Sequence, residues 1–106
     1  MGVDESATTY HRLREQAYED PVATKNEFLK ILADNQALAV AVLTAATDQR
    51  GARFRQITAR ALGKKPLPPD IEKVFNTWIP DETDEFALAA IREAISSSQR
   101  GGTPKP

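Results

Sequence analysis

Six Lys and Arg side chains gather in one short stretch of the chain, residues 50–65, which we call the basic segment; no Asp or Glu lies within it. The other ninety residues hold eight Lys or Arg against fifteen Asp and Glu, a formal charge of −7. Guanidinium and ammonium groups at this density bind phosphates and carboxylates. The sequence therefore predicts a polyanion-binding surface, for which the candidate residues are Arg50, Arg53, Gln56, Arg60, Lys64 and Lys65.

The spacing of these candidates fits one side of a helix. Arg53, Gln56 and Arg60 follow an i, i+3, i+7 pattern, and two lysines continue the stripe beyond the expected helix end. Such a stripe can neutralise several phosphates, and Arg and Gln side chains also hydrogen-bond to base edges. Two other interpretations stay open: the cations pair with acidic helices of the same domain, or they dock an acidic protein.

Residues suited to catalysis or metal binding are scarce. His11 is the only histidine and has no carboxylate or nucleophile beside it in sequence, which indicates a solvated side chain. The acidic residues 81–85 lack the glycine turn and ligand spacing of a calcium loop, and helix capping explains them. The chain has no cysteine and no glycine loop that could cradle a phosphate. We expect no enzyme activity, no catalytic residue, no metal and no cofactor.

Length and composition favour one small cytoplasmic domain. A chain of 106 residues has the size of a single domain and buries a modest core without cross-links. The lack of cysteine fits a reducing compartment, and the polar first twenty residues show no secretory signal. The longest apolar stretch, residues 37–46, is too short to span a bilayer, so no membrane partner is expected.

Helical periodicity accounts for the beginning of the chain. Residues 6–19 form the first expected helix, which ends at Asp20 because a proline follows. Thr24 and Glu27 have the spacing of a capping box and predict that the second helix begins there.

The second helix has two possible ends. It continues to about residue 47, or it breaks at Asp34 and Asn35, because both residues are good N-caps. Residues 37–46 are apolar almost all round, which is typical of the central helix of a bundle.

The basic segment is expected to form a helix over residues 50–62, with Gly63 as a left-handed C-cap. A stiff connector with three prolines, residues 64–69, leads to a helix over residues 69–78. The apolar residues of that helix have ideal helical spacing and predict that its tryptophan belongs to the core: Ile71, Val74, Phe75 and Trp78.

The last helix is expected to begin within the acidic residues 81–85, after Pro80 ends the previous one. Its inner stripe is predicted to consist of Leu88, Ile91 and Ile95.

Residues 57–63, followed by residues 71–78, resemble a helix-turn-helix motif in outline, with a small residue four places before the turn glycine. The connector between them is longer than the usual turn, and the second helix starts with Asp70 and Glu72, which DNA would repel. The resemblance implies DNA binding, and the contacts are then expected from the stripe of arginine and glutamine on the first helix.

These patterns predict an all-α fold: a compact bundle or orthogonal array of five to six short helices with a disordered C-terminal tail. Residues 1–5 are expected to be flexible, residues 6–96 to form a single helical domain, and residues 97–106 to be the tail. The expected function is that of a small, non-enzymatic regulatory domain that contacts nucleic acid through the basic segment. The alternative is a protein–protein adaptor that uses its acidic helices and the basic segment to dock partner proteins or another copy of itself.

Overall fold

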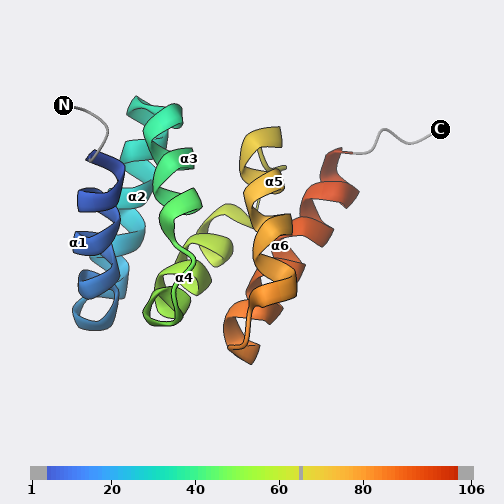
Figure 1. Cartoon of the computed structure of the whole chain (residues 1–106). Helices are drawn as coiled ribbons and strands as arrows, with labels where there is room; N and C mark the ends of the chain where they lie inside the picture. The colour runs from blue at the N-terminus through green and yellow to red at the C-terminus, as the bar shows by residue number, and fades with distance from the viewer. Residues whose placement is uncertain (1–4, 65, 103–106) are drawn as a thin grey trace.

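The computed structural model describes residues 5–64 and 66–102, with side chains up to Ser98, and this part of the chain is all-α (Figure 1). The expected array of five to six helices is thereby confirmed. No helix in the described ranges is long and apolar enough to cross a bilayer. The elements in chain order are α1 (Glu5–Glu19), α2 (Pro21–Asp34), α3 (Gln36–Ala45), the 3₁₀ turn η2 (Gln49–Gly51), α4 (Ala52–Leu62), α5 (Pro69–Trp78), the 3₁₀ turn η3 (Ile79–Asp81) and α6 (Glu85–Gly102).

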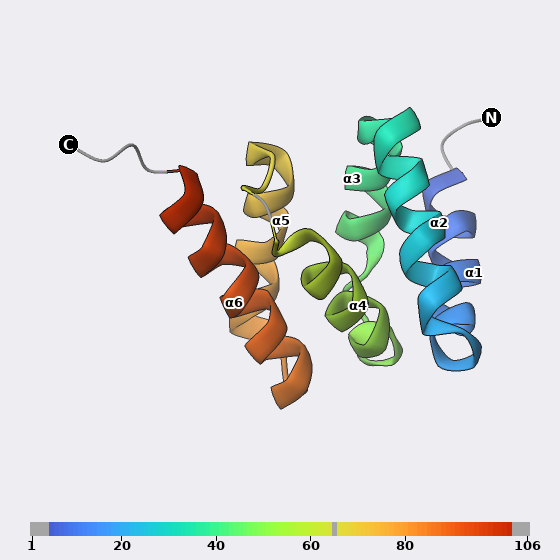
Figure 2. The same cartoon turned by 180° about the vertical axis from the view of Figure 1, so that it is seen from behind.

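Helix α4 lies at the centre of the array. Figures 1 and 2 show α1, α2 and α3 on one side of it and α5 and α6 on the other. Helix α4 contacts α1 and α2, and its most extensive contact is with α6. The apolar helix α3 packs against α1, α2 and α5, and its Ala37 and Thr44 side chains are exposed. The prediction that residues 37–46 form the central helix is wrong, because an alanine-rich run favours helix formation without requiring burial.

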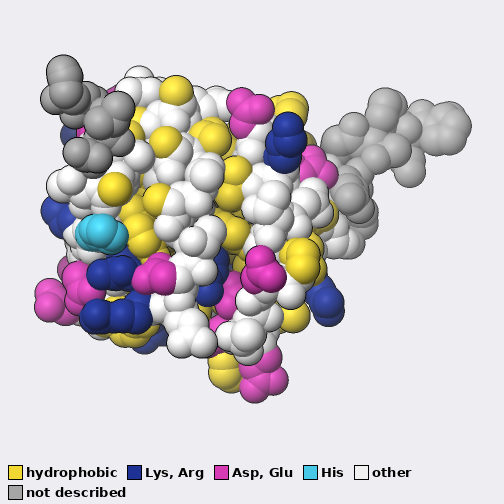
Figure 3. Space-filling model, viewed as in Figure 1, with side chains coloured by type: hydrophobic (Ala, Val, Ile, Leu, Met, Phe, Trp, Pro, Cys, Tyr) yellow, Lys and Arg dark blue, Asp and Glu magenta, His cyan; other side chains and the backbone are white. Residues whose placement is uncertain are grey.

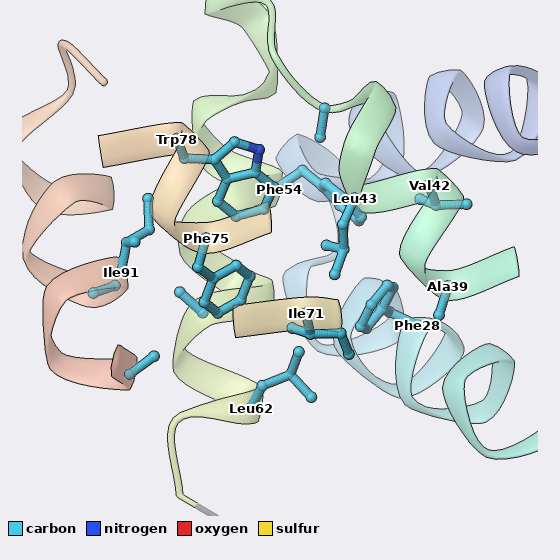
Figure 4. Packing of buried hydrophobic residues seen from close by; sticks show 14 of the residues in the cluster. Phe28, Ala39, Val42, Leu43, Phe54, Leu62, Ile71, Phe75, Trp78 and Ile91 are labelled. Carbon is cyan, nitrogen blue, oxygen red and sulfur yellow. The ribbon is translucent and has the colours of Figure 1, made fainter. Parts of the chain in front are cut away.

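Aromatic side chains from four helices form much of the core (Figure 4). Phe54 of α4 contacts Tyr10 and Phe28 edge-on, with ring centroids 5.6 Å and 5.9 Å away. Phe75 and Trp78 of α5 stack at 4.9 Å. Both geometries are favourable for aromatic pairs. Trp78 is only 4% exposed, so its predicted place in the core is confirmed.

Helix α2 begins at Pro21, three residues before the predicted start. The Asp20 side chain accepts a hydrogen bond from the Ala23 amide at 3.0 Å and so caps the helix. Thr24 is buried inside the helix, where its hydroxyl donates to the Asp20 carbonyl at 2.9 Å. The capping box predicted at Thr24 is therefore wrong. An N-cap aspartate followed by proline at the first helical position is the stronger start signal. The aspartate side chain accepts a hydrogen bond from an amide of the first turn, and proline lacks the amide hydrogen that would have no partner inside the helix there.

The helical segment is interrupted at Asn35, so the second of the two alternatives for the second helix is correct. Helix α2 ends at Asp34, and the Asn35 side chain accepts a hydrogen bond from the Leu38 amide at 3.1 Å. Asn35 is thus both the C-cap of α2 and the N-cap of α3.

Gly63 ends α4, but not in the left-handed conformation predicted for it. Its φ is −73° and ψ is 0°, and no residue in the described ranges has a positive φ. The position is instead crowded on two sides: a Cβ on residue 63 would lie 2.9 Å from the Ala59 carbonyl oxygen of α4 and 3.2 Å from both Cα and Cβ of Ala94 on α6. Glycine is needed here because a side chain would have no room between the end of α4 and α6, rather than for backbone freedom.

Helix α6 begins after Asp84, whose side chain accepts a hydrogen bond from the Ala87 amide at 2.9 Å. Ile91 and Ile95 are buried as predicted, whereas Leu88 is half-buried. The helix continues past the expected boundary at residue 96 to Gly102. Ser98 is buried, and its hydroxyl accepts a hydrogen bond from the Leu67 amide at 2.8 Å, which ties α6 to the proline-rich connector.

The chain ends lie outside this description. Residues 1–4 of the expected flexible N-terminus and residues 103–106 of the expected tail are not among the described residues.

Candidate functional site

The basic segment separates into two ends with different surroundings. At its start, Arg50 lies beside the end of α1, where its guanidinium donates to Glu15 at 3.2 Å. The Tyr18 hydroxyl donates to the Arg50 carbonyl at 3.0 Å. Arg53 is exposed, with its guanidinium 6.0 Å from the centroid of the Tyr18 ring. These first two cations are therefore engaged by one neighbouring helix.

Arg55 is buried and has a structural role that the sequence did not indicate. Its Nε donates to Glu82 at 2.6 Å and its Nη2 to the other oxygen of the same carboxylate at 3.1 Å. Its Nη1 donates to the carbonyls of Ala46 and Asp48 at 3.1 Å and 2.7 Å. The two side chains are 7% and 1% exposed. A bidentate pair buried to this degree joins α4 to the segment before α6 and offers no charge to a ligand.

A second group of hydrogen bonds adjoins this pair. The Tyr10 hydroxyl and the Arg14 guanidinium donate to the two oxygens of Asp48, the latter at 2.8 Å. Partial burial works against ionisation of Asp48, but the bonds from Tyr10 and Arg14 outweigh it and hold the pKa of its carboxyl below the ordinary value. Burial, and then the bond to Asp48, raise the pKa of Tyr10. We call these residues the polar cluster: Tyr10, Arg14, Asp48, Arg55 and Glu82.

The other end of the basic segment faces an open groove between α2, α4 and α6, which lie side by side in Figure 2. The groove has a volume of about 820 Å³. Its floor consists mostly of small side chains, and Val22 and Phe86 on its walls are 62% and 64% exposed. The lining residues are Pro21, Val22 and Lys25 of α2, Ile57, Ala59, Arg60 and Ala61 of α4, Gly63 and Lys64 after it, and Phe86, Ala89, Ala90, Glu93 and Ala94 of α6.

Positive charge predominates around the groove. Lys25, Arg60 and Lys64 are exposed, and none of the three forms an ion pair within the described part of the chain. The one lining carboxylate belongs to Glu93, which accepts a hydrogen bond from Ser97 at 3.4 Å. The groove can therefore hold an apolar group and pair with an anion beside it.

The remaining candidates do not extend this site. Gln56 is half-buried, and Lys65 lies outside the described residues. His11 is exposed on α1, where Figure 3 shows it beside basic and acidic side chains. Among the described residues, no three His, Cys, Asp or Glu side chains are placed to hold a metal ion.

The helices that resemble a helix-turn-helix do not form that motif. Helix α4 packs along α6, whereas α5 packs against α3 and α6. The first helix of the motif should instead pack on the second. Asp70 and Glu72 lie in the first turn of α5, as the sequence indicated.

The residues on the two walls of the groove were missed by sequence reasoning. Phe86 directly follows the acidic residues 81–85 and lies off the stripe of Ile91 and Ile95, which is the one signal that it could face solvent. Val22 gave no such signal, because the helix that carries it was expected to begin later.

No family model, curated protein or solved structure matches this chain. The groove and its charges are therefore the basis on which a function is proposed.

Proposed function

We propose that this chain is a non-enzymatic binding domain that docks a partner protein in the groove between α2, α4 and α6. The observation that carries the proposal is the exposure of Val22 and Phe86 on opposite walls of an apolar floor. Large apolar side chains that face solvent around a concave surface are typical of a protein-binding site.

The composition of the groove agrees with that of protein interfaces. Aromatic and arginine side chains are enriched at such interfaces and are often the residues that contribute most to affinity. Phe86 and Arg60 provide both types within one groove. The groove lies between three helices, an arrangement that accepts a further helix along its length.

A site-specific photocrosslink tests this proposal. We would place p-benzoylphenylalanine at position 86 in cells of the source organism, with a matched control at the exposed Asn76 on α5. The expected result is a discrete protein adduct from position 86 that survives nuclease treatment, with none from position 76. No adduct at position 86, or the same adduct from both positions, contradicts protein docking in the groove.

Nucleic-acid binding is a second candidate, favoured by the exposure of Arg53, Arg60 and Lys64 along the basic segment. Three phosphate contacts would give a salt slope of about −3 with duplex DNA, at about −0.9 per contact. The test is a titration of labelled duplex and single-stranded DNA or RNA at two salt concentrations, with Arg53→Glu/Arg60→Glu as the charge-reversed variant. An absence of binding at low salt, where electrostatic attraction is greatest, removes this candidate.

A further inference from the structure

We infer that the groove binds an amphipathic helix with large apolar side chains on one face and acidic residues along one edge of that face. This inference rests on the proposed function, and it specifies the chemistry of the partner. Shape, charge and the arrangement of exposed apolar residues each contribute to it.

The shape of the floor requires large side chains from the partner. Ala61 of α4 and Ala90 and Ala94 of α6 are buried or half-buried residues of the groove lining, and Gly63 lets the two helices lie close together. Small residues leave depth between helices, which a partner fills best with leucine or aromatic side chains. Such anchors repeat at i, i+3 or i+4, and i+7 on a helix laid in a groove.

The charges of the groove are asymmetric, and the partner should match them. Lys25 on α2 and Arg60 and Lys64 at the end of α4 are cationic, whereas the α6 wall carries Glu93. A partner gains from Asp or Glu on the edge that faces α2 and α4, because the exposed cations of the groove lie on those two helices and directly after α4. The expected ligand is thus acidic along that one edge.

A nucleic acid fits the same groove poorly. Its backbone has no large apolar group for the alanine floor, and its affinity depends on many phosphate contacts. Arg55 of the basic segment is buried against Glu82, and Arg50 is paired with Glu15, so few cations remain for a long polyanion.

A second copy of the chain also fits poorly. Among the described residues, the large apolar side chains that are exposed are Tyr18, Val22 and Phe86. Val22 and Phe86 line the groove itself, so two copies could bury these side chains mutually only by placing their grooves face to face. That arrangement would bring the groove cations of both copies together, and their charges would repel.

A displayed peptide library tests the inference. We would use helical peptides of about 18 residues, or about five turns, with Leu or Phe fixed at the anchor positions. The positions on both edges would vary among Glu, Lys and Ser. Selection against the intact chain should enrich peptides with Glu along one edge only, and amide NMR spectra should place them at Ala61, Phe86 and Ala90.

Charge reversal at the groove is the decisive control. In the variant Arg60→Glu/Lys64→Glu, selection should enrich Lys where the parent chain enriches Glu, and a Glu peptide should bind at least about tenfold more weakly. The matched variant Lys73→Glu/Arg92→Glu has the same net charge but alters exposed cations outside the groove lining, so it should keep the Glu preference.

The outcomes separate this inference from the proposed function. Enrichment of peptides in the groove without a charge preference, or with one that both variants keep, overturns the acidic partner and leaves docking intact. Groove signals that shift only with the concentration of the chain itself assign the groove to a second copy and likewise overturn it. No peptide and no second copy in the groove, together with no crosslink from position 86, overturns both.

Discussion

The two ends of the basic segment differ in what neutralises their charge. At the start, Arg50 pairs with Glu15, and Arg55 is buried against Glu82. At the end, Arg60 and Lys64 are exposed beside an apolar groove and form no ion pair within the described residues. The sequence does not distinguish these cations, yet Arg50 and Arg55 form ion pairs within the fold, whereas Arg60 and Lys64 are accessible to a ligand.

This contrast shows that tertiary neighbours, rather than local charge density, determine the role of each cation. A buried arginine needs every donor satisfied, and Arg55 finds a carboxylate and two carbonyls. An exposed cation beside an apolar surface has no such requirement and keeps its affinity for an external anion.

The largest effect is expected at the buried ion pair. Arg55→Met leaves the Glu82 carboxylate buried without its partner, and such a change costs about 3–5 kcal/mol of the free energy of unfolding. Urea denaturation followed by circular dichroism measures it. The double variant Arg55→Met/Glu82→Leu removes both charges and should recover much of the loss. A single variant as stable as the parent chain would show that the pair is not structural.

A smaller loss is expected from filling the space at two glycines. A Cβ on residue 51 would lie 2.0 Å from the Tyr10 hydroxyl, inside the polar cluster. A Cβ on residue 63 would lie 2.9 Å from the Ala59 carbonyl oxygen and 3.2 Å from Ala94, a smaller overlap. Gly51→Ala should cost about 1–3 kcal/mol, and Gly63→Ala less. Thermal unfolding measures both, and the reverse order would contradict the close packing of the polar cluster.

The polar cluster also predicts a dependence of stability on pH. Its hydrogen bonds hold the folded pKa of Asp48 below the ordinary value of 3.8. The carboxylate therefore stabilises the fold fully above that value, and this contribution is lost as pH falls through the lower folded pKa. The stability difference between the parent chain and Asp48→Asn should narrow below about pH 4. Urea denaturation from acid to neutral pH measures it, and a constant difference would contradict the assignment.

Stability should also depend on pH in the alkaline range, through ionisation of Tyr10. Burial and the bond to Asp48 raise the folded pKa of its hydroxyl above the ordinary value of 10.0. The stabilisation is present below that value and is lost as pH rises toward the folded pKa. Tyr10→Phe has no group to ionise there, so its unfolding free energy should fall less than that of the parent chain above about pH 10. Parallel pH curves for the two proteins would contradict this role.

Local signals in the sequence predicted most of the helices. The proline at position 69 and the apolar spacing up to Trp78 predicted both ends of α5 correctly. The signal for a helix start and the pattern of buried residues indicate the same helix there. The capping box at Thr24 failed because two start signals compete within four residues, and the earlier one has the proline. The prediction of a left-handed C-cap at Gly63 was wrong because glycine also occurs where helices pack closely. The sequence does not show which neighbour leaves no room for a side chain.

The candidate site was predictable only in part. Charge density located Arg60 and Lys64, which line the groove, but it could not show that Glu82 lies against Arg55. That pairing joins residues 27 positions apart and depends on how α4 packs along α6. Phe86 and Val22 line the same groove for the same reason, because it forms only where α2, α4 and α6 pack together. Contacts between distant helices arise only in the folded chain, and a single sequence does not reveal them.

The most direct test of the account is a paired measurement on Arg60→Glu/Lys64→Glu. Both side chains are exposed, so the free energy of unfolding should stay within about 0.5 kcal/mol of the parent value. Binding of a peptide with acidic residues along one edge should fall at least about tenfold, whereas Lys73→Glu/Arg92→Glu should leave it unchanged. An unfolded variant, or undiminished binding in the groove, would contradict the claim that the two ends of the basic segment have different roles.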